Sequence, residues 1–220
     1  MARVVVFGLL ENSSLAHFYL THDSEHEVVA FSVDAEHMPR SPRFEGLPVV
    51  EFERVEEAYP PDGFAFFAPL SPRRMNRLRE SVYTRAKEKG YELISYVSSK
   101  ATVFPGAAVG DNCFILEDNT IQPFTTIGDN VILWSGNHIG HHGSIESHVF
   151  FTSHVVLSGR CVVEPYSFLG VNATVRDGVR ISEGTLVGMA ASVTRDTEPW
   201  GVYTGNPARK GDQPSHELDF

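Results

Sequence analysis

The sequence predicts a small α/β domain followed by a left-handed parallel β-helix. Strand and helix signals alternate through the first part of the chain, which is typical of a parallel sheet with flanking helices. From Val103 the apolar period changes to six and continues without a break to Val193. A short internal repeat of this kind is typical of a β-helix, in which each rung buries its apolar face on the next. The expected domains are therefore 1–98 and 99–220, the second including a C-terminal extension.

Within the first domain, apolar runs predict buried strands at 3–7, 28–33, 64–67 and 93–97. A helix is expected between Pro72 and Gly90, where apolar residues recur at helical spacing and the glycine is a natural end. Those apolar residues are Met75, Leu78, Val82 and Ala86. The alternation predicts a small Rossmann-like sheet.

Ligands of such sheets bind beyond the carboxyl ends of the strands. This rule places a substrate site at Gly8 to Ser13, including Asn12, and at Asp34. The dinucleotide fingerprint G-x-G-x-x-G is poorly matched, because the segment after the first strand keeps one glycine and carries Glu11, which repels phosphate. Two interpretations stay open: this half binds a nucleotide, or its sheet only packs against the second domain.

The hexad run defines the second domain. Every sixth residue is aliphatic or Phe: Val103, Val109, Ile115, Ile121, Ile127, Leu133, Ile139, Ile145, Phe151, Leu157, Val163, Leu169, Val175, Ile181, Val187 and Val193. Glycine follows this residue in five hexads, where a tight corner tolerates no side chain: Gly110, Gly128, Gly140, Gly170 and Gly188. Three hexads make one triangular coil, and the unbroken register leaves no loop outside the prism. An active site must then be built from corner residues, and we expect it to lie against a neighbouring subunit.

Charge and cysteine content narrow the function classes. The net charge is −10, and both halves of the chain are acidic. This balance argues against a nucleic-acid or anionic-membrane partner, for which a basic face supplies the affinity. Cys113 and Cys161 form no metal or disulfide pattern and are expected as buried, reduced thiols in the prism. No membrane-spanning run or signal sequence is recognised, so a cytoplasmic location is expected.

Five histidines lie between positions 138 and 154, which suggests general-base or metal chemistry. His142, His148 and His154 are six residues apart, so they occupy three different corners of one coil and cannot share a metal within one subunit. We therefore expect no metal, although a site between subunits remains open. For His138, His148 and His154 we favour solvated corner positions that help subunits to pack.

His141 differs because Gly159 lies eighteen residues later, one coil away, and must stack beside it. That pairing brings an imidazole next to a backbone N–H that no side chain obstructs. A base and an oxyanion donor are the minimum equipment for acyl transfer. His142 neighbours His141 and is a candidate to orient it.

The chain resembles the NeuD/PglD family of bacterial sugar O- and N-acyltransferases, which use an acyl-coenzyme A donor. The matching stretches are Gly136–Ile145, Ser153–Gly159, Phe168–Val175, Val187–Ala191 and Tyr203–Arg209. The resemblance covers about residues 3–210 and implies that His141 is the catalytic base. The family has Glu or Asp beside the base, whereas this chain has His142.

The resemblance also implies the ligand contacts. Acetyl-coenzyme A is expected at Gly159, Val171, Met189, Asn206 and Arg209, in the groove between two prisms of a homotrimer, with Arg209 and Lys210 facing its phosphates. A nucleotide-linked amino sugar of surface-glycan synthesis is expected in the first domain, where Asp34 matches the family's acid. The mechanism implied is direct attack on the thioester, with Gly159 as oxyanion donor.

Three function classes are therefore considered. The first is a sugar acyltransferase, most simply an N-acetyltransferase, with O-acetylation of a hydroxyl as the alternative. The second is a metal-dependent hydratase similar to γ-class carbonic anhydrases, which share this helix type. The third is a β-helix scaffold without catalysis.

Overall fold

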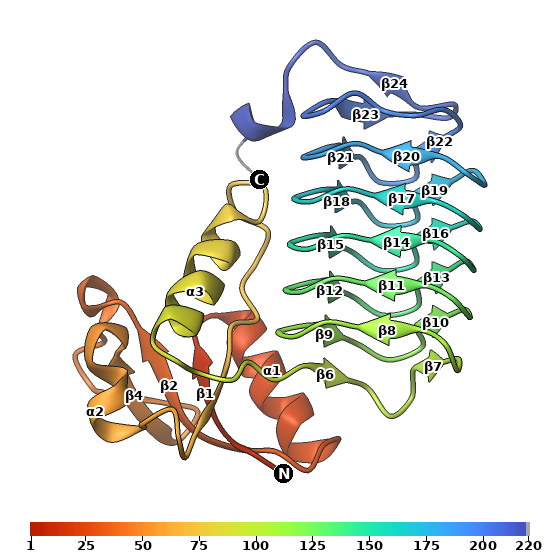
Figure 1. Cartoon of the computed structure of the whole chain (residues 1–220). Coiled ribbons are helices and arrows are strands. Elements are labelled where there is room, and N and C mark those ends of the chain that lie inside the picture. The colour runs from red at the N-terminus through yellow and green to blue at the C-terminus, as the bar shows by residue number, and fades with distance from the viewer. Residues whose placement is uncertain (219–220) are drawn as a thin grey trace.

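The computed structural model describes residues 1–218, so the last two residues of the expected second domain lie outside the described residues. The chain forms an α/β part at one end and one side of a long triangular prism (Figure 1). Both halves of the predicted fold class are confirmed, including the left-handed β-helix. None of the described helices is long and apolar enough to cross a membrane.

The α/β part is built on a five-stranded sheet in the order β3-β4-β2-β1-β5. Its strands are β1 (Arg3–Phe7), β2 (Glu27–Val33), β3 (Arg43–Phe44), β4 (Leu47–Glu51) and β5 (Ala65–Phe67). All neighbours are parallel except β3, which pairs antiparallel with β4. The helices are α1 (Glu11–His22), α2 (Val55–Ala58) and α3 (Arg77–Glu88), with short 3-10 turns at Ala35–His37, Phe52–Arg54 and Ser215–Glu217. The predictions for β1, β2 and β5 are thus confirmed, while α1 and the β3–β4 hairpin had not been predicted.

Helix α3 is shorter than the expected segment because its start is set by the backbone. Arg74, Met75 and Asn76 adopt successive left-handed conformations, with φ of 54°, 49° and 65°, and the helix begins immediately after them. Leu78, expected on the buried face, is exposed, whereas Arg79 is completely buried. The buried face of α3 therefore contains a charged residue that apolar spacing could not reveal.

The expected strand at 93–97 is divided between the two halves, which corrects the prediction. Leu93 forms a single parallel bridge with Phe66 of β5. Tyr96 and Val97 form β6, which pairs with β9 of the prism. The prism sheet thus begins before residue 99, the expected boundary. Val97 stands six residues before Val103, so the hexad phase already marked it as a prism residue.

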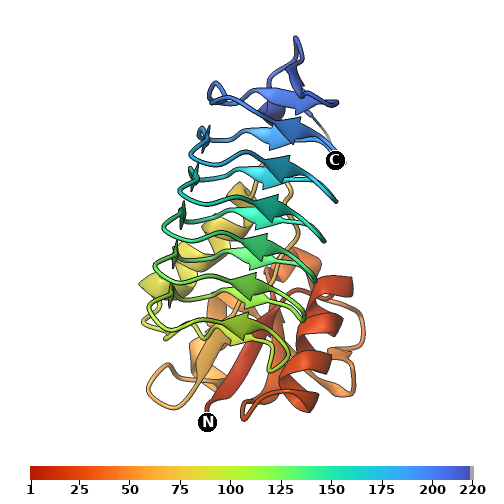
Figure 2. The ribbon, with the colours of Figure 1, turned by 90° about the vertical axis from the view of Figure 1, so that its right-hand side faces the viewer.

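The prism has three faces. Each face is a sheet of parallel two-residue strands, and neighbouring strands lie eighteen residues apart in sequence (Figures 1 and 2). Face 1 contains β6 (Tyr96–Val97), β9 (Phe114–Ile115), β12 (Ile132–Leu133), β15 (Phe150–Phe151), β18 (Phe168–Leu169) and β21 (Leu186–Val187), and is extended by β23 (Val202–Thr204) and β24 (Arg209–Lys210). Face 2 contains β7 (Thr102–Val103), β10 (Thr120–Ile121), β13 (His138–Ile139), β16 (Val156–Leu157), β19 (Thr174–Val175) and β22 (Ser192–Val193). Face 3 contains β8 (Ala108–Val109), β11 (Thr126–Ile127), β14 (Ser144–Ile145), β17 (Val162–Val163) and β20 (Arg180–Ile181).

The repeating aliphatic residue is the second residue of each strand and points into the prism. From Ile115 onward every one of these residues is buried, together with both cysteine thiols, so the predicted core is confirmed. Burial raises the pKa of Cys113 to about 12, which keeps the thiol protonated. The exceptions are Val103, at 39 % exposure, and the partly buried Val109, because both lie on the first coil, where no further coil covers them.

The corners follow the same period. The third residue after the aliphatic is in the left-handed region in successive hexads, including His142, His148 and His154 with φ of 56°, 65° and 59°. The predicted corner glycines stand two residues before this left-handed residue and lie directly against the next coil. A Cβ at Gly140, for example, would lie 2.5 Å from the carbonyl carbon of Ser158. The prediction that these corners tolerate no side chain is therefore confirmed. We call the corners 1–2, 2–3 and 3–1 after the faces that they join.

The α/β part docks on face 1 and on corner 3–1. Outward side chains of face 1, among them Phe114, Ile132 and Phe150, enter one apolar cluster with the sheet and α1. At corner 3–1 the guanidinium of Arg79 donates hydrogen bonds to the carbonyl oxygens of Asn130, Val149 and Leu70, and to the side-chain oxygens of Asn130 and Asn76. No carboxylate pairs with Arg79 among the described residues. Burial lowers its pKa to about 9.

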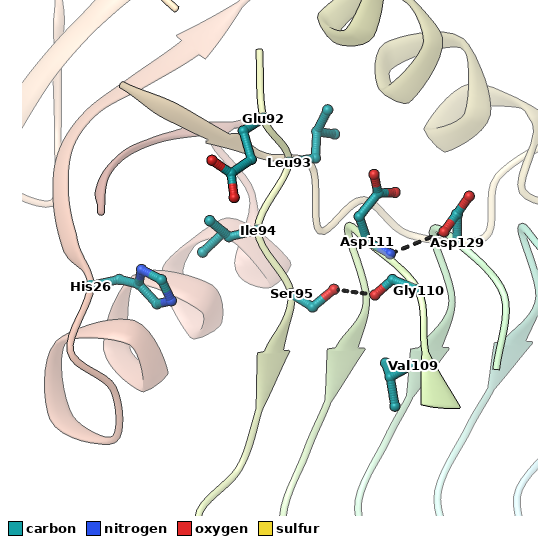
Figure 3. A pocket seen from close by; sticks show the side chains of 9 residues that line it. All are labelled: His26, Glu92, Leu93, Ile94, Ser95, Val109, Gly110, Asp111 and Asp129. Atoms are coloured by element: carbon teal, nitrogen blue, oxygen red, sulfur yellow. Dashed lines mark hydrogen bonds between the residues drawn. The ribbon is translucent and has the colours of Figure 1, made fainter. Parts of the chain in front are cut away.

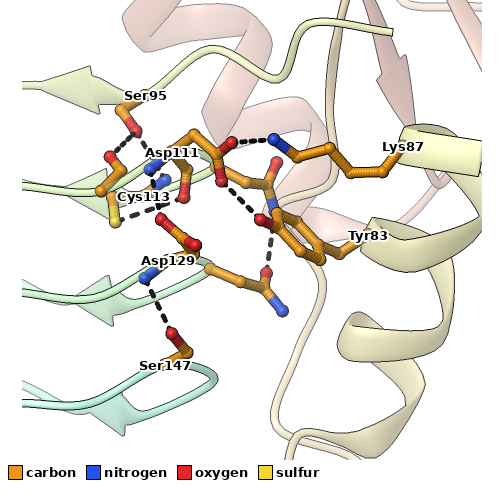
Figure 4. A network of polar contacts seen from close by, with 10 residues as sticks. Tyr83, Lys87, Ser95, Asp111, Cys113, Asp129 and Ser147 are labelled. Atoms are coloured by element: carbon orange, nitrogen blue, oxygen red, sulfur yellow. Dashed lines mark hydrogen bonds and ion pairs between the residues drawn. The ribbon is translucent and has the colours of Figure 1, made fainter. Parts of the chain in front are cut away.

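A second polar group joins α3 to the first coils (Figure 4). The Tyr83 hydroxyl donates a hydrogen bond of 2.8 Å to Asp111, which also forms an ion pair with Lys87. Asp111 in turn donates its backbone N–H to Asp129 of the next coil at 3.0 Å. Burial and the neighbouring carboxylates raise the pKa of Tyr83 strongly, so the hydroxyl stays a donor. These contacts fix α3 along corner 3–1 and leave corner 2–3 on the far side of the prism.

Candidate active site

His141 lies at corner 2–3 with its ring against Gly159, as the register predicts. A Cβ at Gly159 would lie 2.8 Å from Cε1 and 2.9 Å from Nε2 of His141. The Gly159 N–H donates to none of the described residues, whereas its carbonyl oxygen accepts a bond from Gly178 N–H at 2.9 Å. A half-buried imidazole and a free amide therefore share one small space. This is the geometry that a base and an oxyanion donor need.

His142 contacts the other nitrogen of His141. The two Nδ1 atoms are 3.1 Å apart, so one ring donates and the other accepts, and Nε2 of His141 is left to face Gly159. The ring of Phe124, one coil earlier, packs on His142 with a centroid distance of 4.7 Å. His142 is thus held between an aromatic ring and the candidate base. An imidazole thus stands at the position where the resembling family has Glu or Asp.

The backbone of His141 is also fixed. Its N–H donates to Oε1 of Gln122 at 3.0 Å, and its carbonyl accepts from Arg160 N–H at 2.8 Å. Below Gly159, Asp177 Oδ1 lies 2.9 Å from the position of a Cβ, while Asp177 Oδ2 accepts a bond of 3.2 Å from Arg160. Gln122, Arg160 and Asp177 had not been singled out from the sequence, although each stands one coil from a singled-out residue.

The remaining histidines are separated as predicted, but two of their expected placements are wrong. His154 lies exposed at corner 1–2, whereas His138, also expected at a corner, is the first residue of strand β13 on face 2. His148 was expected to be solvated, yet its side chain is only 15 % exposed, because α3 covers corner 3–1. Its ring stacks on Tyr166 at 5.5 Å and bonds Asn130 at 2.9 Å. Among the described residues, no group of three or more His, Cys, Asp or Glu side chains is placed to hold a metal ion.

The residues expected to contact the coenzyme do not all meet within one chain. Val171 and Met189 lie at corner 1–2, where Met189 is 77 % exposed. Asn206 and Arg209 belong to the extension beside them: Thr204 lies against Gly188, and Arg209 pairs with Thr204. Gly159 lies at corner 2–3, across the width of face 2. Lys210 is engaged in an ion pair with Glu198.

Exposed apolar side chains concentrate on face 2 and its two corners. Phe104 and Phe124 lie at corner 2–3, Val156 on the face itself, and Val171 and Met189 at corner 1–2, all at least 39 % exposed. We call these five residues the face-2 patch. Face 1 is covered by the α/β part, so the face-2 patch and His141 lie on surface that the chain itself leaves open.

The predicted substrate residues of the α/β part do gather at one sheet edge. Gly8 follows β1 with φ of 105°, and a Cβ there would lie 2.5 Å from Ser13 Oγ. Helix α1 begins at Glu11 without a side-chain cap, so the N–H groups of Glu11 and Asn12 have no hydrogen-bond partner among the described residues, whereas Ser13 and Ser14 donate theirs to Leu10. Asp34 follows β2, and both terminal nitrogens of Arg85 donate to its Oδ1, at 2.8 and 2.7 Å.

A separate cleft of about 450 Å³ lies at the opposite edge, between the α/β part and the first coils (Figure 3). His26, Glu92, Ser95, Asp111 and Asp129 supply its polar lining. The carboxylates dominate this lining, so the cleft is unsuited to a phosphorylated ligand. None of the residues predicted for substrate or coenzyme lines it.

Comparison with known proteins agrees with the repeat and the fold. Residues 106–141 match the family "Bacterial transferase hexapeptide (six repeats)". A curated relative, an acyl-[acyl-carrier-protein]–UDP-N-acetylglucosamine O-acyltransferase of Sinorhizobium fredii, is 26 % identical over 151 residues, which is 54 % of this chain. The chain spans only about half of that relative, 56 % of its length.

Two groups of solved structures are similar over nearly the whole chain. A mutant of perosamine N-acetyltransferase from Caulobacter crescentus, in complex with CoA and GDP-perosamine, superposes with a TM-score of 0.86 at 24 % identity and covers 97 % of this chain and 98 % of that one. The acetyltransferase domain of PglB from Neisseria gonorrhoeae superposes with a TM-score of 0.83 at 20 % identity, covering 96 % and 100 %. At these identities the likeness establishes a shared fold across both parts of the chain.

Proposed function

We propose that the protein is an acyl-coenzyme A-dependent sugar acyltransferase whose catalytic base is His141. The observation that carries this proposal is the position of His141 Nε2 beside Gly159, whose N–H donates to none of the described residues. It is supported by the similar structures, one of which is described with CoA and GDP-perosamine and another as an acetyltransferase domain. The donor is acetyl-coenzyme A, and the acceptor is the amino group of a nucleotide-linked sugar for surface glycans.

The residues act in one direct displacement. His141 Nε2 accepts a proton from the acceptor nitrogen while that nitrogen bonds to the thioester carbonyl carbon. The Gly159 N–H donates to the carbonyl oxygen as it becomes an oxyanion. The carbon–sulfur bond then breaks, and protonated His141 returns its proton to the departing thiolate. Neither cysteine carries the acyl group, because both thiols are buried in the prism core.

His142 positions the base. If His141 donates from Nδ1 to Nδ1 of His142, its Nε2 carries the lone pair that faces Gly159. The Phe124 ring prevents His142 from turning away. An imidazole partner selects the tautomer of the base without adding a negative charge, which distinguishes this pair from a histidine–carboxylate pair.

The site is completed by a second copy of the chain in a homotrimer. Gly159 and Val171 belong to different corners, so one coenzyme contacts both only if corner 2–3 of one subunit meets corner 1–2 of another. The face-2 patch supplies apolar area for that association. Replacement of Val156 by Asp should shift the trimer to monomers in sedimentation and abolish turnover. His138→Asp, on the neighbouring strand of the same face, removes no apolar side chain and should weaken the trimer less.

The acceptor is held by the α/β part. Asp34 Oδ2 forms no hydrogen bond with the described residues, since Arg85 binds Oδ1, and it is available to sugar or ribose hydroxyls. The free N–H groups at the start of α1 suit a phosphate. The protein is expected to work in the cytoplasm, where coenzyme A and nucleotide-linked sugars are supplied.

The decisive experiment is a screen of nucleotide-linked amino sugars with acetyl-coenzyme A, in which thiol release is followed and the product is identified by mass. An amide product supports the proposal. An ester product instead identifies an O-acetyltransferase. No binding of acetyl-coenzyme A in calorimetry would overturn the proposal in favour of a scaffold, and stoichiometric zinc or iron with hydratase activity would favour the hydratase.

A further inference from the structure

Cations are few in the prism half, and they are unevenly placed. Residues 101–220 contain six: Arg160, Arg176, Arg180, Arg195, Arg209 and Lys210. Three of them, Arg160, Arg176 and Arg195, belong to corner 2–3, the corner of His141. All three follow Gly159 toward the C-terminal end of the prism. Two carboxylates, Asp177 and Asp196, share this corner, so its formal charge is +1 within an otherwise acidic half.

Some of these cations form ion pairs within the chain and others do not. Arg160 binds Asp177, Arg180 binds Glu164, and Lys210 binds Glu198. Arg176 and Arg195, by contrast, are exposed, and their guanidinium groups form no hydrogen bond or ion pair with any residue in the described part of the chain. Their charges are therefore available to a ligand that lies along corner 2–3.

The stacking of coils fixes how far these charges lie from the base. His141, Gly159, Asp177 and Arg195 follow one another at eighteen-residue steps, and the ladder persists into the last coil, where Arg176 N–H donates to Val193. Each step is one strand spacing, so Arg195 lies about 14 Å along the axis from His141.

The pantetheine arm of coenzyme A matches that distance. Its chain from sulfur to the first phosphorus has about as many bonds as four or five peptide residues, which span roughly 15 Å when extended. A thioester at Gly159 with its arm extended toward the C-terminal coils therefore brings the diphosphate to Arg195. Along this path the Asp177 carboxylate is neutralised by Arg160.

We propose that Arg176 and Arg195 bind the diphosphate of the acyl-coenzyme A donor. This inference rests on the proposed function and differs from the expectation that Arg209 and Lys210 face the phosphates. Lys210 is occupied by Glu198, and the Arg209 of the same chain lies at the other edge of face 2, so only a neighbouring subunit could bring its Arg209 to this corner. Arginine suits the role because its planar fork binds two phosphate oxygens at once.

The test compares Arg176→Gln and Arg195→Gln with Arg180→Gln, a matched exposed arginine that is paired with Glu164 on face 3. Calorimetry with coenzyme A and with dephospho-coenzyme A, which keeps the diphosphate, should show each of the first two variants binding roughly tenfold more weakly. Arg180→Gln should bind as the unchanged protein does. With acetyl-pantetheine as donor, kcat/KM should be the same for all four proteins, since this donor has no phosphate.

Other outcomes overturn the inference in distinguishable ways. If the unchanged protein binds no coenzyme A, the proposed function itself fails. If it binds and Arg209→Gln alone weakens the complex, the phosphates lie at corner 1–2. If the effect of Arg195→Gln disappears with dephospho-coenzyme A, that arginine contacts the 3′-phosphate instead of the diphosphate.

Discussion

The imidazole of His141 lies directly against the backbone of Gly159, so that Nε2 is 2.9 Å from where a methyl group on Gly159 would begin. Eighteen residues separate the two in sequence and one strand spacing separates them in space. The missing side chain at 159 is what keeps the base and the amide accessible to the same carbonyl group.

Replacement of Gly159 by Ala should therefore reduce kcat by at least about 100-fold, because the methyl group occupies the reacting space and blocks the oxyanion donor. Ser158→Ala, the neighbouring corner position, is the matched control and should keep its activity. Steady-state kinetics with circular dichroism distinguishes this from unfolding. Full activity of a folded Gly159→Ala protein would remove Gly159 from the site.

Replacement of His141 by Asn should lower kcat by roughly 10²- to 10⁴-fold, the usual contribution of a general base. The binding of acetyl-coenzyme A in calorimetry should change little, since the ring acts on the acceptor proton. His154→Asn replaces an exposed histidine at corner 1–2 of the same chain and should stay active. A His141→Asn protein with more than about a tenth of the original kcat would disprove the base assignment.

Replacement of His142 by Asn should reduce kcat by about tenfold and leave KM for the donor unchanged, because the base keeps its place and loses the partner of Nδ1. Asparagine tolerates the left-handed conformation, so the fold is retained. Phe124→Leu should produce a smaller loss of the same kind. A His142→Asn enzyme with raised KM and normal kcat would show that His142 binds substrate instead of positioning the base.

Replacement of Arg79 by Met should destabilise the protein by about 3 kcal/mol or more, because the Asn130, Val149 and Leu70 carbonyls lose a completely buried charged donor. Urea unfolding followed by fluorescence measures this. Arg40→Met, an exposed arginine without a partner among the described residues, should change stability by less than about 0.5 kcal/mol. Equal stability of both variants would mean that Arg79 does not hold the two halves together.

His148 should make stability depend on pH. Burial lowers its pKa below the ordinary 6.5, with Glu80 and Asp129 opposing that shift and Arg79 adding to it. The unfolded chain therefore takes up a proton near pH 6.5 before the folded one does, so the stabilisation is complete above pH 6.5 and falls as the pH drops below it. The melting temperature should fall between pH 7.5 and 5.5, and His148→Gln should reduce that fall. An identical fall in the variant would assign it to other groups, such as His26.

The fold and the central pair of the site could be read from the sequence, because in a β-helix the spatial neighbour of a residue is found by counting. The sixteen aliphatic positions set the coil length, and the coil length alone places Gly159 beside His141. The same counting placed His142, His148 and His154 at separate corners. The same six-residue spacing also marks Val97 as a prism residue, although the whole strand at 93–97 had been assigned to the first domain.

The contacts on the outside of the prism could not be predicted from the repeat. Arg79 lies outside the apolar pattern that predicted α3, and its acceptors Asn130 and Val149 stand 51 and 70 residues away. His148 looked like a solvated corner for the same reason. The separation of Gly159 from Val171 follows from the register, yet only the position of the α/β part on face 1 shows that face 2 remains open between them.

By itself the sequence determined the prism, its register and the contact of the candidate base with Gly159. These follow from a local repeat in which each coil stacks on the one before. The tertiary structure decided which corner is covered, which charges are paired and which arginines remain free along the corner of His141. The coverage of the corners depends on where α1 and α3 dock, and docking is set by contacts such as those of Tyr19 with Glu117 (98 residues apart) and Tyr83 with Asp111 (28 residues apart), which no periodicity encodes.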